Sequence, residues 1–333
     1  MAVMTRLTRD SAATLLDVYG RAMVDFSPTS LGIENTNYFI TAQRDGTRHE
    51  RLVLTIIEHG LGPDSFLADL LTRLGDAGLP VPALVRTTLG YAYASYPATA
   101  SGDGSPVRPV LLCQRLPGLH RQAPSPDDCA AIGRFLARLH RAARPLLAAA
   151  PDHPRQAAWL ATQSAQLSHH LPPWQVMLLD EAVAYALALM QRADYRALPE
   201  AVVHGDLFRD NALFASNGLA GVIDFHHAAR HKRLFDLSVA INDWCIDSEW
   251  TIDDHRALAL LSGYESLAPL TLAEGQLLPA LLGYAALTFA LSRLQVSTAD
   301  SARPNKSALP MLLTLHNHLR APWLGRAGRL IAG

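Results

Sequence analysis

The segment HGDLFRDN at residues 204–211, followed by DF at residues 224–225, decides how the rest of this chain is interpreted. An apolar pair leads into each polar cluster, Val202-Val203 into the first and Val222-Ile223 into the second. Short β-branched runs that end in polar residues are typical of strands. We therefore expect each acidic cluster to stand at the end of a short strand.

The residues between the two clusters predict a hairpin. Ser216-Asn217-Gly218 separates two short apolar runs, and Asn-Gly is the strongest short-range hairpin signal. A hairpin folds the chain back on itself, so Asp224 should approach Asp206 and Asn211 despite their separation in sequence. Two carboxylates and an amide would then share one site.

This set of side chains matches the needs of phosphoryl transfer. The reaction uses one carboxylate to orient and deprotonate the attacking hydroxyl, and hard oxygen ligands to hold magnesium on nucleotide phosphates. Four residues separate Asp206 from Asn211, as in protein kinases, and Asp224-Phe225-His226 stands where Asp-Phe-Gly would follow. We expect Asp206 and Asn211 to be catalytic, with Asn211 and Asp224 as metal ligands. The alternative is a hairpin whose acids only cap turns.

The same strings resemble known kinases. HGDLFRDN followed by IDF is similar to the aminoglycoside-phosphotransferase and choline-kinase group of small-molecule kinases, in which His-Gly-Asp replaces the His-Arg-Asp of protein kinases. The longer pattern DLFRDNALF…GVIDF…LFDLSVAINDWC, with GIENTNYFIT near the amino terminus, resembles one branch of that group, the homoserine kinases of the kinase-like type. The resemblance covers nearly the whole chain.

This resemblance implies a fold and an activity. The fold would be α+β and protein-kinase-like, with a small antiparallel-sheet lobe and a larger, mainly helical lobe. The cofactors would be ATP and Mg²⁺. The reaction would phosphorylate the side-chain hydroxyl of L-homoserine and give O-phospho-L-homoserine for threonine biosynthesis.

Composition excludes several other classes. Hydrophobic residues make up 49% of the 333 residues, which is enough for the cores of one large or two moderate units. Because 29 basic and 30 acidic residues nearly cancel, we expect no nucleic-acid partner. The amino terminus lacks the apolar run of a signal peptide, and Pro279, Gly283 and Arg293 interrupt the apolar segment 277–294. We therefore expect a cytoplasmic protein that does not bind membranes.

Cysteine usage agrees with that compartment. The three cysteines, Cys113, Cys129 and Cys245, are far apart in sequence and form no Cys-x-x-Cys pair. We interpret them as buried thiols in a reducing environment rather than as metal ligands or redox groups.

The first lobe should contain a hairpin between Phe26 and Glu58, with strands near 37–41 and 52–57. A short helix capped by Thr8 and ended by Gly20 should precede it. The residues just before the first strand stand where a kinase places the loop over the nucleotide phosphates, and small polar residues with backbone amides can line a phosphate pocket. We expect four of them to bind nucleotide: Gly32, Asn35, Thr36 and Asn37.

The second strand of this hairpin departs from the protein-kinase pattern. In VAIK-type kinases a lysine on this strand pairs with the nucleotide phosphates. Here LVLTII at 52–57 has Thr55 at the corresponding place, and the first lysine of the chain is Lys232. Homoserine kinases of the branch that this sequence resembles also tend to carry threonine there. We therefore expect Thr55 to lie at the nucleotide, and magnesium or an arginine to neutralise more of the phosphate charge.

The extended segment 110–118 is similar to the hinge that joins the lobes of these kinases. Its backbone groups at Cys113, Gln114 and Arg115 could hydrogen-bond the adenine edge. We place the boundary here, with residues 1–114 as the nucleotide-binding lobe and 115–333 as the helical lobe with the catalytic loop and the acceptor site.

The second lobe should be mainly helical. Ser125-Pro126 begins one helix, Pro172 to Met190 forms a second, and Thr271 with Glu274 forms a capping box that opens a third. We expect Asp236 to be structural, since it matches an acid that supports the active-site loop in related kinases.

Recognition of an amino-acid alcohol requires opposite charges for its ammonium and carboxylate groups. Asp243 is the candidate for the ammonium, and either Arg209 or Arg293 for the carboxylate. The resemblance adds the NDWC string at 242–245. The substrate candidates are therefore His204, Arg209, Asn242, Asp243, Trp244 and Arg293. Alternatively, residues 242–244 form a solvated helix face and Arg293 a structural ion pair.

Two other functions account for part of the pattern. A kinase of the same fold that acts on choline, an aminoglycoside or a protein serine would share HGDLFRDN and IDF but not GIENTNYF together with NDWC. A catalytically silent nucleotide-binding module would explain Thr55 in place of lysine. The presence of Asp206, Asn211 and Asp224 argues against a silent module.

Overall fold

The computed structural model describes residues 4–29, 35–46, 48–58, 65–97, 107–299, 308–321 and 323. The chain divides into two compact units, Met1–Gly118 and Leu119–Gly333. The sequence placed this boundary after residue 114, whereas the division falls after Gly118.

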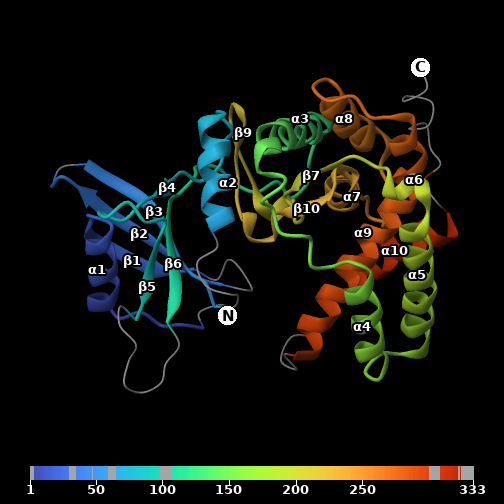
Figure 1. The fold of residues 1–333 in the computed structure, drawn as a ribbon, viewed down its shortest axis with the longest axis horizontal. Coiled ribbons are helices and arrows are strands. Elements are labelled where there is room, and N and C mark those ends of the chain that lie inside the picture. The colour runs from blue at the N-terminus through green and yellow to red at the C-terminus, as the bar shows by residue number, and fades with distance from the viewer. Residues whose placement is uncertain are drawn as a thin grey trace. The chain divides into compact units, whose positions relative to one another are not determined.

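Unit 1 combines an antiparallel sheet with helices (Figure 1). Its described elements are α1 (Arg9–Val18), β1 (Ala22–Pro28), β2 (Thr36–Arg44), β3 (Arg48–Ile56), α2 (Ser65–Asp76), β4 (Leu84–Val85), β5 (Tyr93–Tyr96) and β6 (Arg108–Gln114). The strand order is β1-β2-β3-β6-β4, and β5 also pairs with β6. The predicted hairpin is β2 and β3, in which Asn37 lies opposite Thr55.

The two faces of this sheet differ in character. One face packs with α1 in an apolar core to which β2, β3 and β6 contribute Tyr38, Ile40, Ala42, Leu52, Leu54, Ile56, Val110 and Leu112. Since side chains alternate along a strand, the other face carries the neighbouring residues, including Asn37, Phe39, Thr55 and Cys113. Thr8 caps α1 as predicted, because its side chain accepts a hydrogen bond from the N–H of Ser11.

Unit 2 is mainly helical and carries short strands around residues 200–232. Its described elements are α3 (Pro126–Ala142), η1 (Arg144–Leu146), α4 (Ala157–Ser168), α5 (Pro173–Gln191), α6 (Ala193–Arg196), β7 (Glu200–Val203), η2 (Arg209–Asn211), β8 (Ala212–Ala215), β9 (Gly218–Val222), η3 (Phe225–His227), β10 (Ala229–Lys232), α7 (Arg233–Trp244), α8 (Asp254–Glu265), α9 (Leu272–Ala299) and α10 (Leu309–Arg320). A small antiparallel-sheet unit and a larger helical unit confirm the fold class expected from the sequence.

The segment around residues 200–232 forms two small strand pairs. Val202 and Val203 lie in β7 and Val222 ends β9, so both acidic clusters follow strands, as predicted. The hairpin of β8 and β9 pairs Ala215 with Gly218 and Ala212 with Val222. The sequence did not predict β10, which pairs antiparallel with β7.

Two glycines let α3 and α8 cross at close range. A Cβ atom on Gly133 would lie 2.0 Å from the carbonyl oxygen of Leu260, and one on Gly263 would lie 2.2 Å from that of Ala130. No side chain fits at these distances, so the backbones can approach only where glycine stands. The crossing places Tyr264 of α8 beside His140 of α3, and the Tyr264 hydroxyl lies 2.9 Å from His140 Nδ1.

The long helix α9 is a core helix of unit 2. It opens with the predicted capping box, in which Thr271 Oγ1 accepts from the N–H of Glu274 at 3.2 Å and Glu274 Oε2 accepts from the N–H of Thr271 at 2.8 Å. Length and composition alone would let Leu272–Val296 cross a membrane, but 83% of its most apolar window is buried within the fold. Burial against α5, α7 and α10 accounts for its apolar sequence.

Candidate active site

A buried carboxylate holds the start of segment 204–211. Asp236 of α7 is 0% exposed and accepts hydrogen bonds from the backbone N–H groups of His204 and Gly205, each at 2.8 Å. Gly205 has a φ of +77°, and a Cβ atom there would lie 2.8 Å from the carbonyl oxygen of His227. The turn therefore requires glycine. These bonds confirm that Asp236 supports the loop.

A second contact fixes Asp236 from the opposite direction. His140 donates from Nε2 to Asp236 Oδ2 at 2.9 Å, and its Nδ1 lies 2.9 Å from the hydroxyl of Tyr264. Burial alone would raise the pKa of Asp236, but the hydrogen bond and charge of His140, with the backbone donors, hold that pKa below its usual value. The carboxylate therefore stays ionised and keeps the loop in one conformation.

His204 joins the two acidic clusters. Its Nδ1 accepts from the N–H of Asp206 at 3.2 Å, and its Nε2 donates to the carbonyl oxygen of Ile223 at 3.0 Å. The residue is 0% exposed, and burial lowers the pKa of its imidazole, so the ring is neutral. This arrangement favours a positioning role over the predicted contact with substrate, because both ring nitrogens already bind the chain.

Asn211 lies against Asp206. Its Nδ2 donates to Asp206 Oδ2 at 3.0 Å and to the backbone carbonyl oxygen of Asp206 at 2.8 Å. The amide is thereby oriented with Oδ1 directed away from Asp206. The carbonyl oxygen of Asn211 accepts from the N–H of Ile223 at 2.9 Å, so the chain enters Asp224 beside Asn211. The hairpin brings these residues together as the sequence predicted.

Asn211 and Asp224 offer oxygen ligands for a hard divalent cation. Asp224 has a φ of +65°, a left-handed conformation that is uncommon for a residue other than glycine and is found at functional sites. Among the described residues, no group of three or more His, Cys, Asp or Glu could hold a metal ion. Magnesium is commonly bound by one or two carboxylates together with substrate phosphates. The pair therefore fits a metal that arrives with a nucleotide.

Two predicted substrate groups bind each other. Asp243 Oδ2 accepts from the backbone N–H of Arg209 at 2.7 Å and from its Nε at 3.1 Å. Arg209 Nη1 donates to the carbonyl oxygen of Gln122 at 2.9 Å. Since Asp243 neutralises Arg209, this arginine is a weaker candidate for a substrate carboxylate than Arg293.

Arg293 is linked electrostatically to the centre of the site. Burial lowers the pKa of its guanidinium, and the carboxylates of Asp243, Asp206 and Asp210 oppose that shift. Its Cζ lies 5.1 Å from the ring centroid of Phe208, within the range of a cation–π contact. A half-buried guanidinium near the candidate base is suited to an anionic group of a substrate.

An aromatic pair extends this site toward a second arginine. The rings of Phe208 and Phe289 meet edge-on with centroids 4.6 Å apart. Arg155 Cζ lies 5.3 Å from the ring centroid of Phe289. No motif in the sequence pointed to Arg155, which lies in a loop and meets the aromatic pair only through its contact with Phe289 of α9.

Asn242 and Trp244 support the site from within unit 2. Asn242 is 2% exposed, donates to the carbonyl oxygen of Leu282 at 2.8 Å, and lies 2.8 Å from His318 Nε2. Trp244 is 0% exposed and donates from Nε1 to the carbonyl oxygen of Leu207 at 3.1 Å. Trp244 therefore supports segment 204–211, whereas Asn242 binds α9 and α10, and both placements favour a structural role over the predicted direct contact with substrate.

In unit 1, the nucleotide candidates fall into two groups. Thr55 donates from Oγ1 to Asn37 Oδ1 at 2.7 Å, on the face of the sheet opposite α1. Thr36 is 0% exposed, accepts from the N–H groups of Met4 and Thr5, and donates to Glu58 at 2.5 Å. The side chain of Thr36 is therefore structural here, whereas Thr55 and Asn37 can present polar groups to a ligand.

Two loop candidates remain, Asn35 and Gly32. Asn35 accepts from the N–H of Glu58 at 3.2 Å through Oδ1. Gly32 lies outside the described residues. The sequence missed Glu58, which ties this segment to Thr5 and to Arg108 at 2.8 Å.

The predicted hinge groups are largely used by the sheet. The N–H of Gln114 donates to the carbonyl oxygen of Ala83 at 2.8 Å, and the N–H of Arg115 donates to the carbonyl oxygen of Arg51 at 2.9 Å. Cys113 is 8% exposed, and burial raises the pKa of its thiol to about 12. Adenine recognition by these three residues stays a prediction, and the two occupied N–H groups argue against their use as adenine donors.

Comparison with known proteins agrees with this geometry. A model of the phosphotransferase enzyme family matches residues 25–270. The chain belongs to this phosphotransferase family. It is 37% identical over 301 residues to a homoserine kinase of Pseudomonas aeruginosa, covering 90% of both chains. It is 35% identical over 308 residues to a homoserine kinase of Cupriavidus pinatubonensis, covering 88% of both. It therefore belongs among the homoserine kinases of the phosphotransferase family.

A solved structure supports the fold of this phosphotransferase. The amicoumacin kinase hAmiN, in complex with AMP-PNP, Ca²⁺ and Ami, is 15% identical and covers 93% of this chain and 92% of its own, with a TM-score of 0.67. The likeness confirms a kinase-like fold over nearly the whole chain.

Proposed function

We propose that this chain transfers the terminal phosphate of ATP to the side-chain hydroxyl of L-homoserine, giving O-phospho-L-homoserine and ADP. The observation that carries the proposal is the arrangement of Asp206, Asn211 and Asp224 on a loop fixed by buried Asp236. The homology to homoserine kinases over 90% of the chain supports this acceptor rather than another alcohol.

Asp206 is the proposed general base. Its carboxylate would accept a hydrogen bond from the acceptor hydroxyl and take the proton as the oxygen bonds to phosphorus. Asn211 Nδ2 binds Asp206 Oδ2 at 3.0 Å, which holds the carboxylate in one orientation. The fixed carboxylate then meets the hydroxyl without further reorganisation.

Asn211 Oδ1 and the carboxylate of Asp224 are the proposed magnesium ligands. Magnesium bound there would neutralise charge on the phosphates of ATP. The left-handed backbone at Asp224, with a φ of +65°, follows directly on the hydrogen bond that fixes Ile223 to Asn211. The protein thus holds both ligands through one hairpin.

Arg293 is the proposed partner of the homoserine carboxylate, with Arg155 as a second cation beyond the aromatic pair. The guanidinium of Arg293 interacts electrostatically with Asp206, Asp210 and Asp243, so an anion bound there lies near the base. Asp243 keeps a second oxygen, Oδ1, at 3.4 Å from Arg209 Nη2, and this long contact leaves Asp243 suited to an ammonium group.

A coupled assay of ADP release tests the acceptor. The full chain is incubated with MgATP and, in separate reactions, L-homoserine, L-serine, choline, an aminoglycoside and a serine-containing peptide. We expect homoserine to give the highest kcat/KM. A higher kcat/KM for choline or an aminoglycoside would show that homoserine is not the acceptor. Binding of MgATP without turnover of any alcohol would indicate a catalytically silent module.

A further inference from the structure

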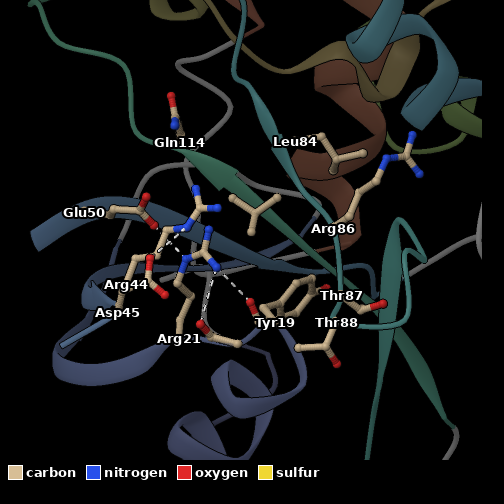
Figure 2. Close-up of a pocket in the computed structure, with 12 residues that line it drawn as sticks. Tyr19, Arg21, Arg44, Asp45, Glu50, Leu84, Arg86, Thr87, Thr88 and Gln114 are labelled. Carbon is tan, nitrogen blue, oxygen red and sulfur yellow. Dashed lines mark hydrogen bonds and ion pairs between the residues drawn. The ribbon is translucent and has the colours of Figure 1, made fainter. Parts of the chain in front are cut away.

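The α1 face of the unit 1 sheet ends in a polar pocket that the proposed reaction does not use. Its volume is about 560 Å³, within the range of small-molecule sites. Its walls come from the α1–β1 junction, the β2–β3 turn, β4 with the residues after it, and the end of β6. The lining residues are Tyr19, Gly20, Arg21, Arg44, Asp45, Glu50, Leu84, Val85, Arg86, Thr87, Thr88 and Gln114 (Figure 2).

The pocket lies on the face of the sheet opposite Thr55. Glu50 and Leu52 alternate with Arg51 and Val53 along β3, and Gln114 lies opposite Leu52 of the α1 core. Thr55 follows the other alternation and lies opposite Asn37. A ligand in this pocket would therefore not occupy the face that carries Thr55 and Asn37.

One arginine of the pocket is held in a fixed orientation. Arg21 Nε binds Glu50 Oε2 at 2.7 Å, and its Nη1 donates to the carbonyl oxygen of Tyr19 at 3.0 Å. Each side chain of the Arg21–Glu50 pair is 13% exposed. A guanidinium held in this way loses little conformational freedom when it binds a ligand.

Arg44 supplies a second, less constrained cation. Ala22 pairs with Gln43 in an antiparallel ladder. Arg21, which precedes Ala22, and Arg44, which follows Gln43, therefore lie at the same end of the sheet. The side chain of Arg44 is 56% exposed. Its Nε lies 3.6 Å from the carboxylate of Asp45, which is a long ion pair, and the Asp45 side chain is 88% exposed. Figure 2 shows the side chains of Arg21 and Arg44 at the same part of the pocket.

Charge and hydroxyl groups define the ligand class. The lining carries three arginines and two acids, Asp45 and Glu50, so it has one excess positive charge. The contacts of Arg21 with Glu50 and of Arg44 with Asp45 balance four of these charges, so the excess positive charge is that of Arg86. Thr87 and Thr88 add hydroxyl groups to the wall. Oxyanions suit this combination, since guanidinium groups bind carboxylate and phosphate oxygens with paired hydrogen bonds.

We propose that this pocket binds a small metabolite through a carboxylate or phosphate group held by Arg21 and Arg44. Gln114 ends the strand that continues into the segment joining the two units, so the ligand would touch the chain next to that connection. The proposal is independent of the acceptor, because none of the proposed catalytic, metal or acceptor residues lines the pocket, and Gln114 is its one lining residue among the nucleotide candidates.

Calorimetric titration of the full chain tests this site, with MgAMP-PNP present throughout to occupy the nucleotide site. Inorganic phosphate and malonate are titrated separately at constant ionic strength. We expect at least one of them to bind at millimolar concentration, and Arg44→Gln to weaken that binding about tenfold, the loss of one charge-assisted contact. Arg51→Gln is the matched control, because Arg51 is an exposed arginine on the other face of β3.

The two titrants distinguish the sources of the anion. Binding of phosphate alone that requires Arg44 assigns a phosphorylated ligand, and binding of malonate alone assigns a carboxylate. Absence of binding for both, or binding that Arg44→Gln leaves unchanged, would overturn the proposal. Because Arg44 is exposed, an unchanged thermal midpoint in the variant verifies that any loss of binding is local.

Discussion

The segment 204–211 of unit 2 and the Thr55 face of unit 1 are built in opposite ways. In unit 2, a fully buried carboxylate, Asp236, binds two backbone N–H groups and His140. In unit 1, a neutral hydroxyl, Thr55, binds the neutral amide of Asn37 at 2.7 Å. The first arrangement joins catalysis to stability, because the groups that position the base also lie in the core. The second can change with little effect on folding.

This contrast explains how a kinase-like site can lack the small-lobe lysine. In unit 2, Arg293 interacts electrostatically with Asp206, Asp210 and Asp243, whereas the Thr55 face of unit 1 offers neutral groups. We therefore expect substitutions in unit 2 to have larger effects than substitutions on the Thr55 face, and each prediction measures one side of that difference.

The largest effect is expected at the base. Asp206→Asn should lower kcat about 10²- to 10⁴-fold, the usual contribution of general acid–base catalysis, with little change in the free energy of unfolding. Steady-state kinetics with homoserine and urea denaturation measure the two quantities. Asp210→Asn, an exposed acid four residues later, should retain activity within a few-fold. A kcat of Asp206→Asn close to wild type would exclude Asp206 as the base.

The supporting carboxylate should affect both quantities. Asp236→Asn leaves the shape of the side chain unchanged but removes its charge from three hydrogen bonds. We expect the free energy of unfolding to fall by about 3 kcal/mol, as when a buried charged partner is lost, and kcat to fall with it. Asp194→Asn, an exposed acid paired with Arg192, should change neither. An unchanged free energy of unfolding for Asp236→Asn would show that the contacts that hold the catalytic loop do not stabilise the fold.

Part of the loss of folding stability at acidic pH should come from His231 in unit 2. Burial lowers the pKa of His231 from 6.5 to about 4, so the folded state keeps this ring neutral while the unfolded state protonates it. Stability from this group is therefore complete above pH 6.5 and is lost as pH falls toward 4, by about 3 kcal/mol. Urea denaturation across this range should show a shallower pH slope for His231→Phe. An unchanged slope would show that His231 does not titrate on unfolding.

The smallest effect is expected on the Thr55 face. Thr55→Val removes the hydrogen bond to Asn37 and should raise KM for ATP about fivefold, the equivalent of roughly 1 kcal/mol. The free energy of unfolding should stay close to wild type. A fall in kcat as large as that of Asp206→Asn would contradict the contrast between the two units.

Sequence reasoning succeeded where the signal was local. The spacing of Asp206, Asn211 and Asp224 and the Asn-Gly turn between them predicted the hairpin, because short-range backbone geometry determines it. The capping residues Thr8 and Thr271 were predicted for the same reason. Local rules of this kind do not depend on the rest of the fold.

Partners across long sequence distances were not predictable. The pairing of Arg209 with Asp243 and the burial of Asn242 depend on how α7 packs, and a polar helix sequence does not show which side faces the core. The approach of Arg155 to Phe289 likewise needs the position of α9. Family resemblance named Asn242 and Trp244 as substrate candidates, whereas in the structure Trp244 binds Leu207 of the loop and Asn242 binds Leu282 and His318.

We propose above all that this catalytic site recognises an amino-acid alcohol. The most direct measurement compares kcat/KM for L-homoserine with that for 3-aminopropan-1-ol, which lacks only the carboxylate, in wild type, Arg293→Gln and the exposed control Arg320→Gln. We predict that wild type and the control prefer homoserine about 100-fold, the worth of a charged hydrogen-bonded contact, and that Arg293→Gln loses most of that preference. Equal turnover of the two alcohols by wild type would contradict the claim.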